Sequence, residues 1–449
     1  MKQFLKLSLC IGCTAFCLNQ SIAQNPLIQD QFTADPSARV FGDSVYVYPS
    51  HDIVPPEGKG RPEWFNMGDY HVFSSGDLNQ WTDHGVIVSQ ENVPWVNPES
   101  YSMWAPDAIE RNGKYYFYFP SIPKDTLDGR GFKIGVAVAD APEGPYTPEP
   151  EPIKNVKGID PNVFIDDDGQ AYLYWSARHI FGARLSENML EIESPPETLK
   201  ELPEQGLKEG PYMFKHNGLY YLTYPHVEHK TERLEYAISD HPLGPFEQKG
   251  VIMDESPTGC WTNHHSIIAF KGQHYLFYHH NDLSPEFDKN RSIRADSLFF
   301  QTDGSIKKVI PSLRGVGITP ATEKIDLDRF SKKSDGASIG FMDPEDPFKG
   351  WFISLKEQQW LRYDKIDFNS GLKNAILMNK SAAGAVLELR LDERNGPLLM
   401  QIKLSGGKGW SAENELVKSV VSGTHDLFVI CKSGSVMIDW IRFGNAKKE

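Results

Sequence analysis

The fold is decided by the stretch Ile109-Glu110-Arg111-Asn112-Gly113-Lys114-Tyr115-Tyr116-Phe117-Tyr118-Phe119, in which a short apolar run turns at Asn-Gly and continues as an aromatic-rich strand. Asn-Gly or Asp-Gly between alternating apolar residues is the strongest short signal for a β-hairpin, because type I′ turns need positive φ at both central positions. Similar hairpins at regular spacing predict the blades of a β-propeller. The alternative is an ordinary all-β sandwich with accidentally similar hairpins. The pattern occurs at 39–48, 109–119, 163–175, 213–224 and 267–278.

A second repeat supports the propeller. The loops 141–146, Ala-Pro-Glu-Gly-Pro-Tyr, and 241–246, His-Pro-Leu-Gly-Pro-Phe, match each other in spacing. Beyond the hairpins the chain turns polar and charged, and the tail then carries evenly spaced strand-like runs that predict a small antiparallel β-sandwich. We therefore expect an all-β chain with a signal peptide at 1–23, a five-bladed propeller at 24–330, a linker at 331–338 and a jelly-roll-like β-sandwich at 339–449.

The composition narrows the class of protein. With 449 residues the chain is too long for one sandwich, and its formal net charge of -14 argues against a nucleic-acid partner. The apolar run 7–18 is too short to span a membrane, and Ser21-Ile22-Ala23 is typical of a signal-peptide cleavage site. We expect export to the periplasm or the extracellular space, with a lipid anchor at Cys13 as the alternative. Only Cys260 and Cys431 lie outside the signal, so no disulfide framework is predicted.

Three acidic residues occupy matching places at the starts of expected blade strands. Asp35 and Asp160 each directly precede a proline, and Glu209 precedes Gly210-Pro211. The starts of inner strands converge at one mouth of a propeller. Cleavage of a glycosidic bond needs two carboxyl groups, one protonated and one ionised. The three acids therefore predict a carboxylate site on the propeller axis, although an acid before proline is also an ordinary turn residue.

The segments around these acids resemble glycoside hydrolase family 43, the five-bladed propeller enzymes that act on arabinose- and xylose-containing polymers. The resemblance covers nearly the whole propeller, in the family's order. Related fructosidases carry Arg-Asp-Pro and Glu-Cys at the middle and last acids, whereas this chain has Ile-Asp-Pro and Glu-Gly-Pro. The matching segments are Ala34-Asp35-Pro36-Ser37, Tyr46-Val47-Tyr48-Pro49-Ser50-His51-Asp52, Met103-Trp104-Ala105-Pro106-Asp107, Gly158-Ile159-Asp160-Pro161-Asn162, Lys208-Glu209-Gly210-Pro211-Tyr212 and Asn263-His264-His265-Ser266-Ile267.

The resemblance implies roles for the acids. It makes Asp35 the general base, Glu209 the general acid, and Asp160 the residue that orients the acid and tunes its pKa. The acid needs a raised pKa to stay protonated near neutral pH, and a second carboxylate nearby supplies such a rise. With water between the base and the sugar, the reaction would invert the anomeric centre.

The resemblance also implies residues that contact the sugar or an ion. Trp104, Arg291 and His51 are expected at the substrate, with core packing as the alternative for Trp104 and a surface position as the alternative for Arg291. No cofactor is expected for the reaction itself. His264 matches the family's central-channel histidine, near which a structural Ca²⁺ is the expected ion. Because calcium prefers oxygen ligands, waters would complete its shell.

The tail resembles carbohydrate-binding module family 6. Two positions depart from that family's binding pattern: Met437 stands where an asparagine that contacts sugar is usual, and Glu413 stands where a second tryptophan often follows Gly409-Trp410. We therefore expect a domain that braces the propeller rather than one that binds sugar. The matching residues are 360–363, 366–368, 387–392, 409–410, 422–427 and 438–440.

Together these features predict an exported, inverting exo-glycosidase that removes terminal α-L-arabinofuranosyl or β-D-xylosyl residues from plant hemicellulose. We place α-L-arabinofuranosidase first and β-xylosidase second. The two sugars present similar geometry around the reacting carbon, and the sequence does not separate them. A non-catalytic carbohydrate-binding propeller is the alternative from another class, and the complete set of three acids argues against it. The expected partner is a plant cell-wall polysaccharide or oligosaccharide, without nucleic acid, and the protein is expected to be a monomer.

Overall fold

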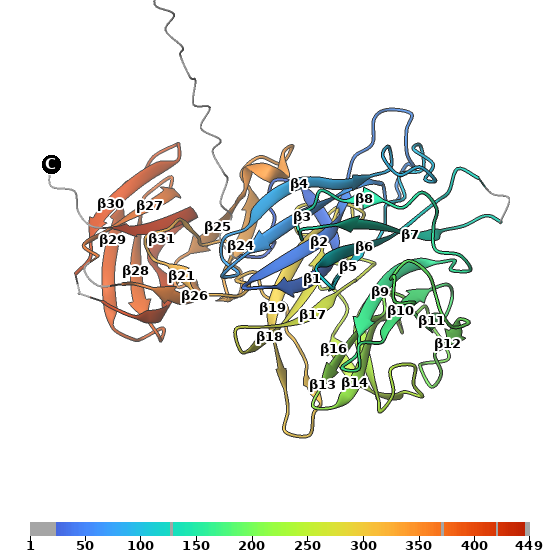
Figure 1. The fold of residues 1–449 in the computed structure, drawn as a ribbon. Helices are drawn as coiled ribbons and strands as arrows, with labels where there is room; N and C mark the ends of the chain where they lie inside the picture. The colour runs from blue at the N-terminus through green and yellow to red at the C-terminus, as the bar shows by residue number, and fades with distance from the viewer. Residues whose placement is uncertain (1–23, 126–128, 370–371, 419–420, 445–449) are drawn as a thin grey trace, which may run out of the picture.

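Each repeated hairpin belongs to a four-stranded antiparallel sheet, and the five sheets are arranged as the blades of a β-propeller (Figure 1). The computed structural model describes residues 24–125, 129–369, 372–418 and 421–444, so the expected signal peptide at 1–23 lies outside them. Within every blade the strands pair in chain order, which confirms the predicted five-bladed propeller. The strands are β1–β4 (Phe32–Phe41, Ser44–Asp52, Met67–Ser75, Thr82–Ser89), β5–β8 (Asp107–Arg111, Lys114–Ser121, Lys133–Ala139, Thr147–Pro148), β9–β12 (Ile159–Ile165, Ala171–Ser176, Ile180–Arg184, Glu197–Thr198), β13–β16 (Tyr212–His216, Leu219–Val227, Glu232–Ser239, Glu247–Met253) and β17–β20 (Ser266–Phe270, Gln273–His280, Ser292–Phe300, Ile306–Lys307).

Tyrosines of the repeats connect the first four blades in sequence. They lie on the second strand of a blade, and their hydroxyls donate to carbonyls in the loop between the third and fourth strands of the following blade. Two of these acceptors, Pro142 and Pro242, belong to the matched Pro-x-Gly-Pro loops. The tyrosines of the hairpin repeat are thus hydrogen-bonded to the loops of the second repeat. The pairs are Tyr48 Oη to Pro142 O (2.6 Å), Tyr118 Oη to Met189 O (2.7 Å) and Tyr174 Oη to Pro242 O (2.7 Å).

A buried carboxylate joins three blades near the axis. Asp107 directly follows the Trp-Ala-Pro motif and lies on β5, in blade 2. It accepts hydrogen bonds from residues of blade 1 and of blade 3. Such a buried charge is tolerated because it is paired with an arginine and fully hydrogen-bonded. The donors are Ser37 Oγ (2.5 Å), Arg39 Nη2 (2.5 Å), Asn162 Nδ2 (3.0 Å) and the Val163 amide (2.7 Å).

The tail forms a β-sandwich of eleven strands, as predicted. Its strands alternate between buried and partly exposed side chains; in β28, for example, Leu387 and Leu389 are fully buried. This period of two is the pattern of strands with one face on a core. The strands are β21 (Thr319–Pro320), β22 (Ile325–Asp326), β23 (Lys332–Lys333), β24 (Ser338–Phe341), β25 (Trp351–Lys356), β26 (Trp360–Asp367), β27 (Asn374–Lys380), β28 (Ala385–Leu391), β29 (Leu398–Leu404), β30 (Ser411–Leu416) and β31 (Thr424–Gly444).

The segment between propeller and sandwich is taken up by short strands. β21 and β23 pair with β26, and β22 pairs with β31, so residues 319–333 are part of the sandwich sheets. The expected linker, 331–338, thus includes β23 and the start of β24. Two-residue strands carry no periodic pattern, which is why this pairing could not be predicted from the polar composition of the segment.

Polar contacts hold the sandwich against the propeller. Arg314 Nε donates to the carbonyl of Asp364 at 2.7 Å, and its guanidinium lies over the ring of Tyr363. Gln24, at the beginning of the described chain, donates from Nε2 to the Tyr363 hydroxyl at 2.5 Å. The sandwich is therefore packed against the two segments that flank the propeller, one before blade 1 and one after blade 5.

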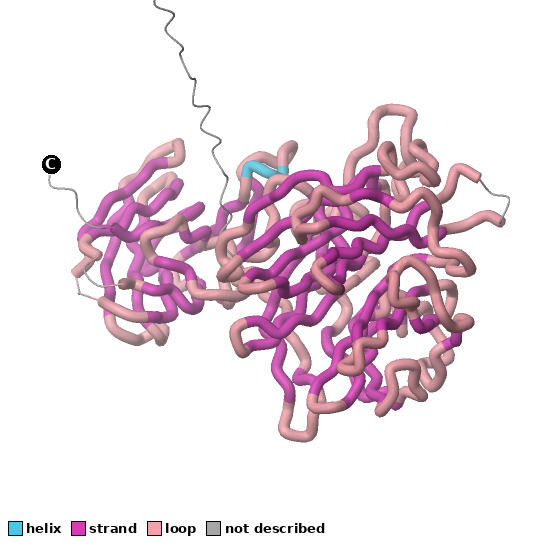
Figure 2. The backbone as a smooth tube through the Cα atoms, viewed as in Figure 1, coloured by secondary structure: helices cyan, strands magenta, loops and turns pink. Residues whose placement is uncertain are grey.

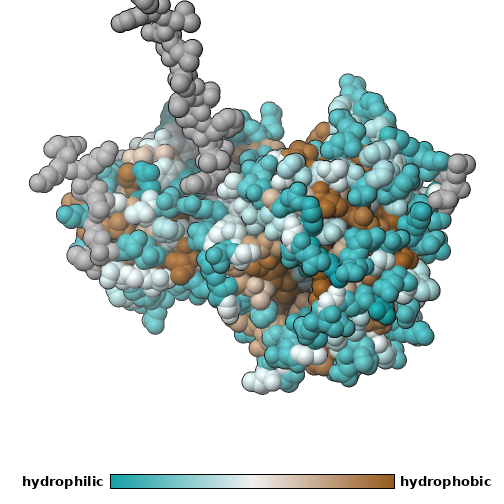
Figure 3. Space-filling view, viewed as in Figure 1, coloured by the Kyte–Doolittle hydropathy of each residue, from teal (hydrophilic) through white to brown (hydrophobic). Residues whose placement is uncertain are grey.

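The described residues contain almost no helix. Figure 2 shows strands throughout and one short helical turn, a 3₁₀ turn at Pro347–Lys349. Among these residues no helix has the length and apolar character needed to cross a membrane. Polar side chains cover most of the face shown in Figure 3, as expected for a chain with a net charge of -14.

Candidate active site

A cavity of about 170 Å³ lies where the first strands of the blades begin. Three of its lining residues are the predicted acids Asp35, Asp160 and Glu209, which come from blades 1, 3 and 4. Aromatic rings form another part of the wall. The remaining lining residues are Trp64, Phe65, Met67, Trp104, Ala105, Ile159, Glu232, Trp261, Thr262, Asn263, His264 and Arg291.

Most of the residues predicted from sequence meet in this cavity. Trp104, Arg291 and His264 line it together with the three acids. The Trp104 ring also packs against Phe132, at 4.5 Å between ring centroids, so its core-packing and cavity-lining roles coexist. His51 does not line the cavity: its Nδ1 is 2.7 Å from Asp69 Oδ1, in a separate cluster with His71.

The three acid segments share an unusual backbone conformation directly before the proline. The residue directly before the proline has positive φ in all three segments: 48° at Asp35, 56° at Asp160 and 53° at Gly210. Positive φ is uncommon for residues with a side chain, and such strained positions cluster at functional sites. In the third segment the residue before the proline is Gly210. The acid, Glu209, lies one residue earlier than the aspartates of the other two segments and has a longer side chain.

Asp35 is held as a carboxylate by an arginine. Arg291 Nη1 donates to Asp35 Oδ1 at 2.9 Å, and Ser50 Oγ donates to Oδ2 at 2.6 Å. Burial raises the pKa of Asp35, but Arg291, the nearby histidines and Ser50 outweigh that rise and lower its pKa to about 2. Asp35 is therefore ionised at neutral pH.

Asp52 is the second carboxylate that binds Arg291. Arg291 donates to Asp52 from its backbone amide (2.8 Å), from Nε (2.9 Å) and from Nη2 (2.8 Å). The two carboxylates and the guanidinium are all at least nine-tenths buried. One arginine thus satisfies two buried aspartates by the planar, multidentate geometry that lysine cannot offer.

His279 is neutral and contributes a fixed acceptor. Its Nδ1 accepts the backbone amide of Asp35 at 3.1 Å, which assigns the ring proton to Nε2, 3.1 Å from Thr262 Oγ1. Burial, followed by the charge of Arg291, lowers the pKa of His279 to about 3. The imidazole therefore orients the backbone at Asp35 without supplying a proton.

The pKa values of Asp160 and Glu209 are raised, whereas that of Asp35 is lowered. Burial and then the charge of Glu209 raise the pKa of Asp160 well above its ordinary value. Burial also raises the pKa of Glu209; contact with Glu232 and the charge of Arg291 oppose that rise, and the charge of Asp35 supports it. Asp160 and Glu232 are buried and Glu209 is partly exposed, and three acids this close, which cannot all ionise, share protons and titrate as a unit. The Asp160 carboxyl is positioned by the Gly210 amide, which donates to its Oδ2 at 3.0 Å.

Glu232 is a site residue that the sequence reasoning missed. It is 1% exposed, its Oε2 accepts the Asn263 amide at 2.6 Å, and burial and the charge of Glu209 raise its pKa well above the ordinary value. It begins the third strand of blade 4 in the ordinary-looking segment Thr231-Glu232-Arg233. No turn or motif marks it, so only its burial beside Glu209 identifies it.

The surroundings of His264 do not form a calcium cage. His264 is buried in the cavity wall, and burial lowers its pKa, so the ring is neutral. Among the described residues, His, Cys, Asp and Glu side chains gather in a metal-binding arrangement only at His51, Asp69 and His71. A calcium ion at His264 would have to take most of its six to eight ligands from water.

Comparisons with known proteins place the chain in a family. The model of Glycosyl hydrolases family 43 matches residues 23–306, and the model of Carbohydrate binding module (family 6) matches residues 351–445. A Humicola insolens protein named Xylosidase/arabinosidase 43A is 38% identical over 63% of this chain and 98% of its own length. The Arabinoxylan arabinofuranohydrolase of Bacillus subtilis is 28% identical over 90% of this chain and 88% of its own length.

The chain is also similar to a solved structure. The compost-metagenome enzyme CoXyl43, described as a family 43 β-xylosidase/α-arabinofuranosidase in complex with xylotriose in a calcium-free form, is 36% identical, covers 65% of this chain and 98% of its own, and has a TM-score of 0.58. A five-bladed propeller with buried carboxyls around a small cavity, and these relatives, make the chain a glycoside hydrolase. It belongs to family 43, with a C-terminal domain of carbohydrate-binding module family 6.

The positions that depart from the binding module's usual pattern lie at the sandwich surface. Met437, on β31, is 37% exposed, and Glu413, on β30, is partly exposed. Trp410 packs beside Phe352, with 5.8 Å between ring centroids. The chain thus offers one tryptophan at this place, and no second aromatic ring at position 413.

Proposed function

We propose that this protein is an inverting exo-glycosidase that releases single terminal α-L-arabinofuranosyl or β-D-xylosyl residues from hemicellulose, with α-L-arabinofuranosides preferred. Export is part of this proposal and rests on the signal-like pattern of residues 1–23. We rank arabinofuranosides above xylosides, as we did from the sequence. The β-xylosidase reading is the second candidate, favoured by the xylotriose bound in the CoXyl43 structure.

The observation that carries the proposal is the opposite protonation of carboxyls around one cavity. The pKa of Asp35 is held at about 2, whereas the pKa values of Asp160, Glu209 and Glu232 are all raised. Titratable groups whose environments push their pKa values apart are the acid and base of an enzyme working near neutral pH. A non-catalytic sugar-binding propeller has no need of such a separation.

The reaction follows from this division of protons. Asp35 accepts a proton from a water molecule as that water's oxygen forms a bond to the anomeric carbon. Glu209 gives its proton to the glycosidic oxygen as the bond between that oxygen and the anomeric carbon breaks. The released sugar carries the water oxygen on the opposite face, so its configuration is inverted, and Glu209 is left ionised until it regains a proton.

The size of the cavity supports exo action. About 170 Å³ is below the roughly 300–1,000 Å³ of pockets that hold drug-sized ligands, so the cavity suits one pentose ring rather than a polymer segment. Its aromatic side chains, such as Trp104 and Trp261, offer flat apolar faces to a sugar, and its polar floor offers carboxyls and Arg291.

The test compares 4-nitrophenyl α-L-arabinofuranoside with 4-nitrophenyl β-D-xyloside on the purified protein, and follows the first-formed sugar by proton NMR. We expect turnover of both, a higher kcat/KM on the arabinofuranoside, and a product of inverted configuration before mutarotation. A higher kcat/KM on the xyloside would establish the second candidate. A product of retained configuration would exclude the water-activating role of Asp35.

Replacing Asp160 by Asn should move the alkaline limb of the pH–rate profile to lower pH. A group with a raised pKa acts as an acid below that pKa and loses this ability as the pH rises through it. Removal of a carboxyl that can ionise beside Glu209 lowers the pH at which Glu209 loses its proton. The measurement is kcat/KM against pH for the wild type and the variant, with Asp166→Asn, an aspartate outside the cavity lining, as control. An unchanged limb would show that Asp160 only positions the acid.

A further inference from the structure

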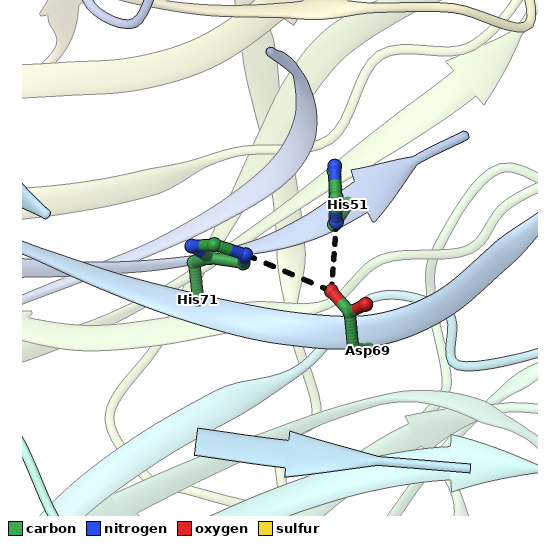
Figure 4. Close-up of side chains that lie close together, drawn as sticks. All are labelled: His51, Asp69 and His71. Atoms are coloured by element: carbon green, nitrogen blue, oxygen red, sulfur yellow. Dashed lines mark hydrogen bonds and ion pairs between the residues drawn. The ribbon is translucent and has the colours of Figure 1, made fainter. Parts of the chain in front are cut away.

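Three side chains of blade 1 that the reaction does not use lie together on two neighbouring strands. His51 comes from β2, and Asp69 and His71 come from β3 (Figure 4). One potential ligand atom from each lies within 4.8 Å of the other two. His51 Nδ1 is 2.7 Å and His71 Nε2 is 3.9 Å from Asp69 Oδ1. Tyr70, between the two β3 residues, is fully buried on the other face of the strand.

A neighbouring carboxylate orients His71. Both oxygens of Asp83 lie close to His71 Nδ1, at 3.0 and 3.1 Å, so this nitrogen donates its proton to Asp83 and leaves Nε2 free toward Asp69. Asp83 is itself held by the Gly85 amide, at 2.7 Å, and by Gln31 Nε2, at 3.3 Å. A carboxylate that holds the far nitrogen of a histidine is the usual outer shell of a metal-bound imidazole.

The spacing and charge of the cluster suit a small divalent cation. Ligand atoms around a tetrahedral zinc with bonds of about 2.0–2.1 Å lie about 3.3 Å apart, and the two distances from Asp69 Oδ1, 2.7 and 3.9 Å, lie on either side of that value. Among the described residues Asp69 and Asp83 form ion pairs only with histidines. The side chains are 15–26% exposed, so an ion and a water molecule can reach them.

We propose that His51, Asp69 and His71 bind one transition-metal ion of the Zn²⁺ type, with water at the remaining position. Two imidazoles and a carboxylate favour such an ion over calcium or magnesium, which prefer all-oxygen shells. This site is separate from His264. Its ion would fix β2 to β3 beside Ser50 and Asp52, which hold Asp35 and Arg291 from the adjacent positions of the chain.

The test measures metal binding directly in the full chain. After treatment with a chelator, the wild type and the variants His51→Asn and His71→Asn are titrated with ZnCl₂ by calorimetry and with CoCl₂ by visible absorption. We expect the wild type to bind one equivalent more than either variant and to show the intense absorption of four- or five-coordinate cobalt. Asp83→Asn should weaken binding about 10–100-fold while keeping the stoichiometry.

A matched control is His84→Asn, on β4 of the same blade, where His84 Nε2 is 2.7 Å from Ser74 Oγ. This variant should bind zinc as the wild type does, and zinc should raise the Tm of both but not that of His51→Asn. If His71→Asn does not fold, Asp69→Asn replaces it, because the amide can still bond to His51. Equal stoichiometry in wild type and ligand variants, or no saturable binding by the wild type, would overturn the proposal.

Discussion

Asp35→Asn and Glu209→Gln should each lower kcat on an unactivated arabinoxylan oligosaccharide by at least about 10²–10⁴-fold, the range that one acid or base contributes. The amide at position 35 cannot accept the proton of the attacking water, and the amide at position 209 has none to give to the leaving oxygen. Both changes keep the size of the side chain. Near-native turnover by either variant on the unactivated substrate would show that the assignment of that residue is wrong.

The two variants should differ on an activated substrate. 4-Nitrophenolate leaves without a proton, so Glu209→Gln should regain much of its activity on a 4-nitrophenyl glycoside, whereas Asp35→Asn should stay inactive on both substrates. Circular dichroism and the Tm of each variant serve as the control for folding. Equal losses on both substrates in Glu209→Gln would argue against proton donation to the leaving group.

Arg291→Met should destabilise the protein by about 3–5 kcal/mol, because it leaves Asp35 and Asp52 buried without their shared cation. Burial of Asp35 is then opposed only by the nearby histidines and Ser50, so its pKa should rise from about 2, and the acidic limb of kcat/KM should move to higher pH. Urea unfolding followed by fluorescence gives the free energy of unfolding. Arg291→Lys should restore part of the stability, since one ammonium cannot bond both aspartates in the same multidentate way.

The pH dependence of this loss has a definite sign. The pKa of Asp35 is lowered from 3.8 to about 2 on folding, so the ionised carboxylate stabilises the fold at pH above about 4, and this contribution disappears as the pH falls through about 2. The difference in unfolding free energy between wild type and Arg291→Met should therefore shrink across that interval. A difference that stays constant down to pH 2 would show that lost packing, not the ion pair, causes the destabilisation.

The features that could be predicted from sequence are those that local chemistry determines. Asn112-Gly113 adopts positive φ at both residues whatever surrounds it, so the hairpins and hence the blade repeat are visible in the chain. The acids before proline are visible because the same short pattern recurs at the starts of blade strands. Their convergence followed from the circular arrangement of the blades.

Long-range packing decides the features that could not be predicted. Glu232 becomes a site residue only because β15 places it beside Glu209, and Asp52 only because Arg291 reaches across from another blade. His51 lies in the same short motif as Asp52 but on the other face of β2, so a match of the motif could not place its side chain. The pairing of β21, β22 and β23 depends on partners that lie far along the chain.

The blades are consecutive in the chain, and among the strands of the described residues none from one end of the propeller completes the sheet at the other end. The ring therefore closes between blade 5 and blade 1 without a shared sheet, through contacts such as Ser266 Oγ to the carbonyl of Pro36, at 2.7 Å, and the bonds from Arg291 to Asp35. Asp35, the proposed base, is thus held by contacts across the seam of the ring. During refolding, the recovery of activity should therefore report when the ring closes, and it should lag behind the burial of tyrosines within blades. A protein in which blades 5 and 1 are not yet in contact should have most of its sheets folded and yet be inactive.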